Sequence, residues 1–169
     1  EAAGPRECFA TCAEARLPEA IREALQAAAQ QTSFAPLDAD LDDMVDLVTI
    51  VHSGLAAEWG SDSPRIWSHN WWLPQLFSPG PLLPSVAPYT ICSAFFGIRN
   101  DPDTDHEMNP PLRIGVVVHE MLSSLGLPYL YDTDGRGQGV GLYDVMANPW
   151  GPDGQQLYPG ALSPWSKMQ

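Results

Sequence analysis

One apolar segment, residues 112 to 125, constrains the fold of this chain more than any other part of it. The run reads LRIGVVVHEMLSSL, which predicts an α-helix that begins near Ile114. Pro128 follows closely and favours the end of a helix before it. The first turns are β-branched, so a strand is the competing interpretation there. Inside the run stand two ionisable residues, His119 and Glu120.

This His-Glu pair is the strongest chemical signal in the sequence. A helical zinc peptidase site needs two His residues one turn apart, with a Glu beside the first as general base. Position i+4 from His119 is Ser123, so the H-E-x-x-H pattern is incomplete. Taken alone, the pair favours a hydrogen-bonded pair in the core.

The residues around the pair resemble the active-site helix of the immune inhibitor A family, which are secreted, metzincin-like zinc metallopeptidases. The family pattern is H-E-x-G-H-x-L-G-L-P-D-L-Y-D. The chain matches it at His119, Glu120, residues 125 to 128 and residues 130 to 132. Further stretches are similar to other family motifs, in the same order along the chain: residues 48–54, 66–69, 134–135, 141–147 and 165–167.

The resemblance implies an α+β fold: one zincin-like metallopeptidase domain with a mixed sheet and an active-site helix. We expect residues 1–169 to form this single domain as a fragment of a longer chain. The resemblance also implies a secreted, extracellular protein. Its partner would be a peptide or protein substrate that adds as a strand along the sheet edge.

The resemblance also implies the roles of the site residues. His119 is the first zinc ligand, and Glu120 is the general base that activates the zinc-bound water. The family's second and third ligand positions hold Ser123 and Tyr129, and its Gly is Leu122. Neither a neutral hydroxyl nor a phenol is a good zinc ligand, so zinc is expected to bind weakly or not at all. Two functions follow: a metallopeptidase, or an inactive pseudopeptidase that binds peptides or proteins.

The remaining histidines are the other candidates for a zinc ligand. They are His52, His69 and His106, and His106 lies in an acidic loop just before the helix. A ligand from that loop is an alternative, but surface or hydrogen-bonded roles are more typical of all three. By the resemblance, Met146 lies in a turn beneath the zinc site, where it packs and does not coordinate.

An acidic stretch near residue 40 is a second candidate metal site. Asp38, Asp40 and Asp42 have D-x-D-x-D spacing, and Asp46 follows. Carboxylates at alternate loop positions suit calcium, so calcium is the functional interpretation. The pattern is not an EF-hand loop, and a solvated acidic turn is the alternative. Residues 132–137 form a weaker candidate because they include an arginine.

The remaining segments predict an ordinary globular core. Residues 17–31 have the spacing of an amphipathic helix, and residues 47–52 and 89–96 predict strands, the first of them buried. Residues 54–88 are rich in Gly, Pro, Ser and Trp, which indicates irregular structure with at most one short strand. Cys8, Cys12 and Cys92 are odd in number, so either one pair leaves a thiol over or all three are free.

Composition limits the partners. The chain has 8 Lys and Arg against 21 Asp and Glu, a net charge of −13. Phosphate surfaces repel such a chain, which argues against nucleic acid and anionic membranes as main partners. No run of about 18 apolar residues is present, so membrane insertion is not expected. No signal peptide is visible, and a mature product or an excised fragment is expected.

Overall fold

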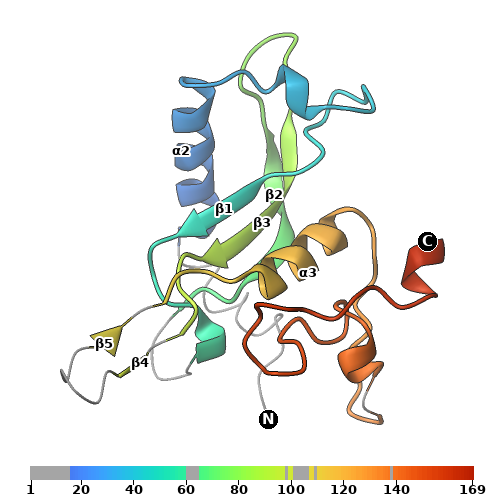
Figure 1. Ribbon diagram of the computed structural model, residues 1–169. Helices are drawn as coiled ribbons and strands as arrows, with labels where there is room; N and C mark the ends of the chain where they lie inside the picture. Colours follow the sequence, from blue (N-terminus) through green and yellow to red (C-terminus); the bar gives the residue numbers. More distant parts are fainter. Residues whose placement is uncertain (1–15, 60–64, 98, 101–106, 109, 138) are drawn as a thin grey trace.

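The computed structural model describes residues 16–59, 65–97, 99–100, 107–108, 110–137 and 139–169. Three strands form a mixed sheet in the order β1-β3-β2. Their bounds are Thr49–His52 for β1, His69–Phe77 for β2 and Val86–Ser93 for β3. The central strand β3 is parallel to β1 and antiparallel to β2. Helices α2 and α3 lie on opposite sides of this sheet (Figure 1), so the expected α+β class is confirmed.

Helix α2 (Leu17–Ala29) covers one face of the sheet and forms the main core with it. Pro18 occupies the first turn, where its missing N–H leaves no hydrogen bond unmade. Ile21 and Leu25 are buried one turn apart and face the sheet. Each such side chain contributes about 1.5–3 kcal/mol through burial. The buried cluster consists of Ile21, Leu25, Phe34, Val45, Leu73, Phe77, Val86, Tyr89 and Ile91.

Residues 54–88 were expected to be irregular with at most one short strand, but β2 spans nine of them. Pro74 lies inside it, and pairing with β3 is interrupted between Trp72 and Phe77. Proline is tolerated there because β2 is an edge strand. Strand β1 is also at an edge, which leaves Val51 half-exposed where a buried strand was expected.

Helix α3 (Ile114–Ser124) packs on the other face of the sheet and confirms the helix expected there. The hydroxyl of Ser124 lies 2.9 Å from the Thr90 hydroxyl and accepts a 2.7 Å hydrogen bond from the Asn70 amide. The helix ends in a turn in which Gly126 and Leu127 donate to carbonyls of the last turn, with Gly126 at φ 97°. These contacts fix the face of α3 that carries the His-Glu pair.

Gly115 allows the C-terminal segment to approach the start of α3. A Cβ at this position would lie 2.1 Å from the Pro149 carbonyl oxygen, and the Gly115 N–H donates to the Gln156 carbonyl at 2.9 Å. Only glycine permits this approach. The segment around Pro149 is therefore held against the helix that carries the site.

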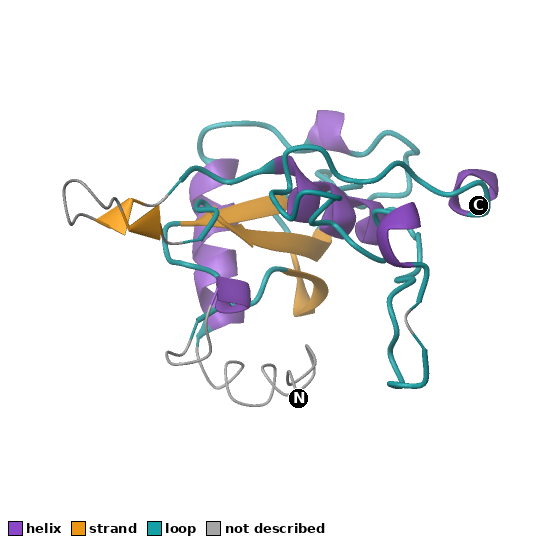
Figure 2. Ribbon diagram, turned by 60° about the horizontal axis from the view of Figure 1, so that its bottom comes forward, coloured by secondary structure: helices purple, strands orange, loops and turns teal. Residues whose placement is uncertain are grey.

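Short elements connect the rest of the chain, which runs mainly as loops and turns after α3 (Figure 2). The 3₁₀ helices are Ala35–Leu37, Ala57–Trp59, Gly141–Tyr143 and Ser166–Met168, and a small hairpin pairs β4 (Arg99–Asn100) with β5 (Glu107–Met108). No helix in the described ranges is long and apolar enough to cross a membrane. Cys92 is a buried free thiol, whereas Cys8 and Cys12 lie outside the described residues.

Candidate active site

A cleft of about 470 Å³ opens beside the His-Glu pair of α3. The start of β2, the first turns of α3 and two later loops form its walls. Its lining consists of Glu58, Trp67, Ser68, His69, Asn70, Trp71, Val116, His119, Glu120, Tyr129, Tyr131, Asp132, Ala147, Asn148, Pro149 and Trp150. Sequence segments far apart in the chain, with the His-Glu pair among them, thus meet at one concave surface.

His119 is held in one tautomer by the backbone. Its Nδ1 lies 2.8 Å from the carbonyl oxygen of Val145, which can only accept, so Nδ1 carries the proton. Nε2 therefore keeps its lone pair. Burial lowers the pKa of His119 below its ordinary value, although the Val145 carbonyl opposes the shift. The imidazole is a neutral, oriented base, as a metal-binding histidine must be.

Asp144 organises the turn that supplies the Val145 carbonyl. This fully buried carboxylate accepts hydrogen bonds from the N–H groups of Met146 at 2.8 Å and Ser163 at 2.9 Å, and from the hydroxyl of Ser166. Burial alone would raise its pKa, but these hydrogen bonds outweigh burial and hold the pKa below the usual range. The turn at Met146 and the Ser166 segment, both singled out by the sequence, are thereby joined. Met146 itself is buried, as expected for a packing residue.

Glu120 lies beside His119 in a low-dielectric environment. Burial raises its pKa to about 7, and the charge of Glu58 adds to that rise. The phenol of Tyr129 donates a 2.9 Å hydrogen bond to Oε2 of Glu120, which opposes the rise. A carboxyl group with a pKa near neutrality can accept or release a proton at physiological pH.

Tyr129 approaches the His-Glu pair after the turn that ends α3, as the family's third ligand position predicts. Its ring stacks on the His119 imidazole at 5.0 Å between centroids, and Tyr131 follows at 5.2 Å from Tyr129. Burial raises the pKa of Tyr129, the charge of Glu120 adds to this, and a hydrogen bond with Ser123 opposes it. The phenol is therefore neutral. Its proton is directed at the carboxylate of Glu120.

The residues at this site do not fit the three-ligand zinc centre that the resemblance implies. Within the described ranges, no group of three His, Cys, Asp or Glu ligand atoms gathers at His119. Tyr129 stacks on the imidazole and keeps its proton, whereas a phenol binds zinc only as phenolate. Ser123 offers only a neutral hydroxyl. His106, the alternative ligand from the loop, lies outside the described residues.

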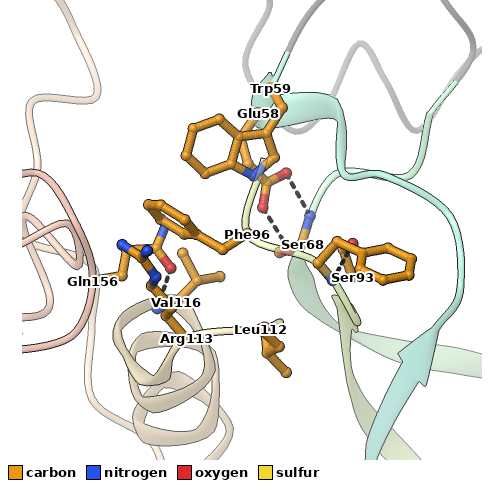
Figure 3. Close-up of a pocket in the computed structure, with 10 residues that line it drawn as sticks. Glu58, Trp59, Ser68, Ser93, Phe96, Leu112, Arg113, Val116 and Gln156 are labelled. Atoms are coloured by element: carbon orange, nitrogen blue, oxygen red, sulfur yellow. Dashed lines mark hydrogen bonds between the residues drawn. The ribbon is translucent and has the colours of Figure 1, made fainter. Parts of the chain in front are cut away.

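Glu58 is a site residue that the sequence analysis missed. It comes from a short 3₁₀ helix and accepts hydrogen bonds from the Ser68 hydroxyl at 2.6 Å and the Ser68 N–H at 3.3 Å (Figure 3). It lines both the cleft and a neighbouring cavity of about 10 Å³. Beside that cavity the Arg113 guanidinium lies over the Phe96 ring at 3.8 Å. Nothing in the local sequence around Glu58 signals this placement.

The other two described histidines have hydrogen-bonded roles. His69 lines the cleft, and its Nδ1 donates to the Trp67 carbonyl at 2.6 Å. His52 accepts a 3.2 Å hydrogen bond from the Gly54 N–H through Nδ1. Burial lowers the pKa of both rings. Neither joins His119 in a metal-binding group within the part of the chain that is described.

The acidic loop brings three of its four candidate calcium ligands together. Carboxylate oxygens of Asp38, Asp40 and Asp42 lie within 4.8 Å of one another. Repulsion from Asp42 raises the pKa of Asp40. Asp46 is not in this group, because its Oδ2 accepts the Ala39 N–H at 2.8 Å.

In the weaker candidate, residues 132–137, the Asp132 carboxylate is occupied by backbone N–H groups of its own loop. Arg136 pairs with Asp134 at 3.8 Å, both largely exposed. A cation would therefore have to compete with donors already in place. Asp38 and Asp42 also accept backbone N–H groups of their own loop, so residues 38–42 are the better candidate only because three carboxylates converge there.

Comparison with known proteins agrees with this architecture. Residues 37–169 match the family model described as the immune inhibitor A peptidase M6 catalytic domain. The chain is also 29% identical over 133 residues to Immune inhibitor A of Bacillus thuringiensis subsp. alesti. That alignment covers 75% of this chain and 18% of the relative, so the chain spans a small part of the relative's length. The cleft, its helix and the turn beneath it are thus those of a peptidase-like domain, and the chain belongs to the immune inhibitor A peptidase family, M6.

Proposed function

We propose that this domain binds an extended peptide in the cleft as a pseudopeptidase, without a family-type zinc centre. The hydrogen bond from Tyr129 to Glu120 carries the proposal. It ties the residue at the family's third ligand position to the residue at the general-base position. A neutral phenol in this arrangement supplies no metal ligand and occupies one oxygen of the base.

The position of β2 supports peptide binding. Among the described residues β2 is at the edge of the sheet β1-β3-β2, and residues at its start line the cleft. A strand at a sheet edge can take up an extended peptide as an added strand. The same cleft provides side-chain contacts to that peptide. Peptide binding therefore needs no metal.

Two further parts of the proposal follow from family membership and from the acidic loop. The domain acts outside the cell, as the family resemblance implies. Asp38, Asp40 and Asp42 hold a calcium ion, since their oxygens converge within 4.8 Å. This ion would stabilise the loop before β1 and has no part in chemistry at the cleft.

Retained peptide-bond hydrolysis is the second candidate. Hydrolysis is favoured by the neutral imidazole of His119, whose Nδ1 donates to the Val145 carbonyl. It is also favoured by Glu120, whose pKa is about 7. This function needs metal ligands that the described residues do not supply. Of the three remaining histidines, His106 in the loop before α3 is the one that lies outside the described residues.

Zinc content and casein cleavage separate the two candidates. The purified chain is stripped with a chelator, incubated with excess zinc, desalted and measured for bound zinc. We expect far less than one zinc ion per chain and no casein cleavage beyond a Glu120→Gln control. Stoichiometric zinc with cleavage that Glu120→Gln abolishes would replace the pseudopeptidase with the peptidase.

A further inference from the structure

The charges on the cleft wall are of one sign. Three carboxyl side chains line the cleft, and none of its described lining residues is Lys or Arg. The carboxyl groups belong to Glu58, Glu120 and Asp132. The cleft therefore attracts cations, and low-dielectric walls concentrate that attraction.

Aromatic rings form much of the same wall. They belong to Trp67, Trp71, Tyr129, Tyr131 and Trp150. Contacts fix several of these rings: the Tyr129 and Tyr131 centroids are 5.2 Å apart, and Trp150 packs edge-on at 5.0 Å against Trp59, which lies outside the cleft lining. Trp71 lines the cleft and is 49% exposed. Ring faces attract a cation placed within about 6 Å of their centres.

A cation that enters this cleft meets both kinds of group at once. We propose that the cleft accepts an arginine side chain of the bound peptide, with its guanidinium between the aromatic rings and the carboxylate of Glu58. The inference rests on the proposed peptide-binding function and adds the side chain that the cleft selects. A guanidinium is favoured over an ammonium because its plane stacks on rings and its fork matches a carboxylate. The cleft volume of about 470 Å³ is ample for such a side chain.

Four labelled peptides test the selection directly. Each is a short, blocked polyalanine peptide with one central residue: arginine, lysine, leucine, or citrulline, which keeps the shape of arginine without its charge. Binding is followed by fluorescence anisotropy. We expect the arginine peptide to bind about tenfold more tightly than the citrulline peptide. The lysine peptide should fall between them, and added salt should narrow the difference.

Variants with matched controls locate the preference in the cleft. Glu58→Gln removes a charge but keeps an acceptor for Ser68, and should reduce the arginine preference severalfold. Glu23→Gln makes the same charge change on exposed α2 and should leave the preference intact. Trp71→Ala removes a cleft ring, whereas Trp72→Ala removes a neighbour that is 61% exposed and does not line the cleft. Circular dichroism confirms that each variant is folded.

The outcomes separate this inference from the function beneath it. Equal binding of the arginine, citrulline and leucine peptides would overturn arginine selection and leave peptide binding in place. A preference that Glu58→Gln and Trp71→Ala leave unchanged would also overturn it. Lysine binding as tight as arginine would overturn the guanidinium preference. Absence of binding by all four peptides would overturn both the inference and the proposed peptide-binding function.

Discussion

Tyr129 donates a 2.9 Å hydrogen bond to Glu120 across the turn that ends α3. The contact joins a residue at a family metal-ligand position to one at the general-base position. It also stabilises the charged form of Glu120, against the burial that raises the pKa of that carboxyl to about 7. The pair is thus a structural unit whose members depend on each other.

Replacing Glu120 should change how stability depends on pH. Its pKa is raised from 4.5 to about 7 on folding, so between these values the folded chain binds more protons than the unfolded chain. The free energy of unfolding of the parent therefore loses a contribution as pH rises through this window. The free energy of unfolding of Glu120→Gln, relative to that of the parent, should therefore rise by about 3 kcal/mol from pH 4.5 to pH 8. Urea unfolding in the presence of a chelator measures the difference.

Glu23→Gln is the control for this titration, because Glu23 is exposed on α2. Its free energy of unfolding should follow the parent at every pH. Comparing each variant with the parent cancels the contributions of His52, His69 and His119, whose lowered pKa values act in the opposite direction. Parallel curves for Glu120→Gln and the parent would show that Glu120 titrates as an ordinary glutamate.

Asp144 should be the most sensitive polar residue beneath the site. Asp144→Ala leaves the N–H groups of Met146 and Ser163 and the Ser166 hydroxyl without their acceptor. We expect a loss of about 3 kcal/mol or more at neutral pH, measured by urea unfolding. Ser166→Ala should cost about 1–2 kcal/mol, because only one hydrogen bond to a charged group is lost.

The pH dependence of Asp144 has the opposite sign to that of Glu120. Its pKa is lowered on folding, so its contribution is present above the ordinary value near 3.8 and is lost as pH falls through the folded pKa. Asp144→Ala should therefore converge with the parent in acid. Lys167→Ala, at an exposed neighbour of Ser166, is the control and should change stability little. A small cost for Asp144→Ala at neutral pH would contradict the assigned network.

Calcium should raise the melting temperature if the acidic loop binds it. An ion bound only by the folded chain stabilises it by mass action. We expect a rise in millimolar calcium relative to a chelator, and loss of that rise in Asp40→Asn. Asp153→Asn, at an exposed aspartate elsewhere, should keep the rise. An equal melting temperature with calcium and with chelator would favour the plain acidic turn.

The sequence predicts those features whose signals lie within one short segment. Periodicity predicts helix α3. The family motif within it identifies His119 and Glu120 as site residues, and the spacing of that motif identifies positions 123 and 129 as its other two ligand positions. The length of strand β2 was underestimated, because the Trp- and Pro-rich composition of residues 54–88 favours at most a short strand there. Only the tertiary position of β2 at a sheet edge makes Pro74 tolerable.

Features of the site that depend on long-range contacts left no readable signal. Glu58 reaches the cleft because Ser68, ten residues away, donates two hydrogen bonds to it. The Asp144 carboxylate joins two motifs that the resemblance identified separately. Their physical connection is a set of hydrogen bonds to residues 19 and 22 positions further along the chain. Such partners are chosen by the fold, so local pattern alone does not identify them.

The double variant Ser123→His with Tyr129→Asp tests whether the missing ligands alone prevent zinc binding at this site. An imidazole at position 123 would lie on the same face of α3 as His119, one turn on. A carboxylate at position 129 would replace the phenol that now contacts Glu120. We expect the double variant to bind about one zinc ion per chain after reconstitution, with the parent binding far less.

The matched control, Ser123→Gln with Tyr129→Asn, makes substitutions of similar size that add no imidazole and no carboxylate. It should bind as little zinc as the parent. Casein cleavage is not required for the prediction, because Leu122 stands where the family has Gly, and the larger side chain would take up space beside the new ligand. Any cleavage that does arise should vanish when Glu120→Gln is added, while zinc stays bound. A folded double variant that takes up no zinc would mean that positions 123 and 129 are not the missing ligand positions.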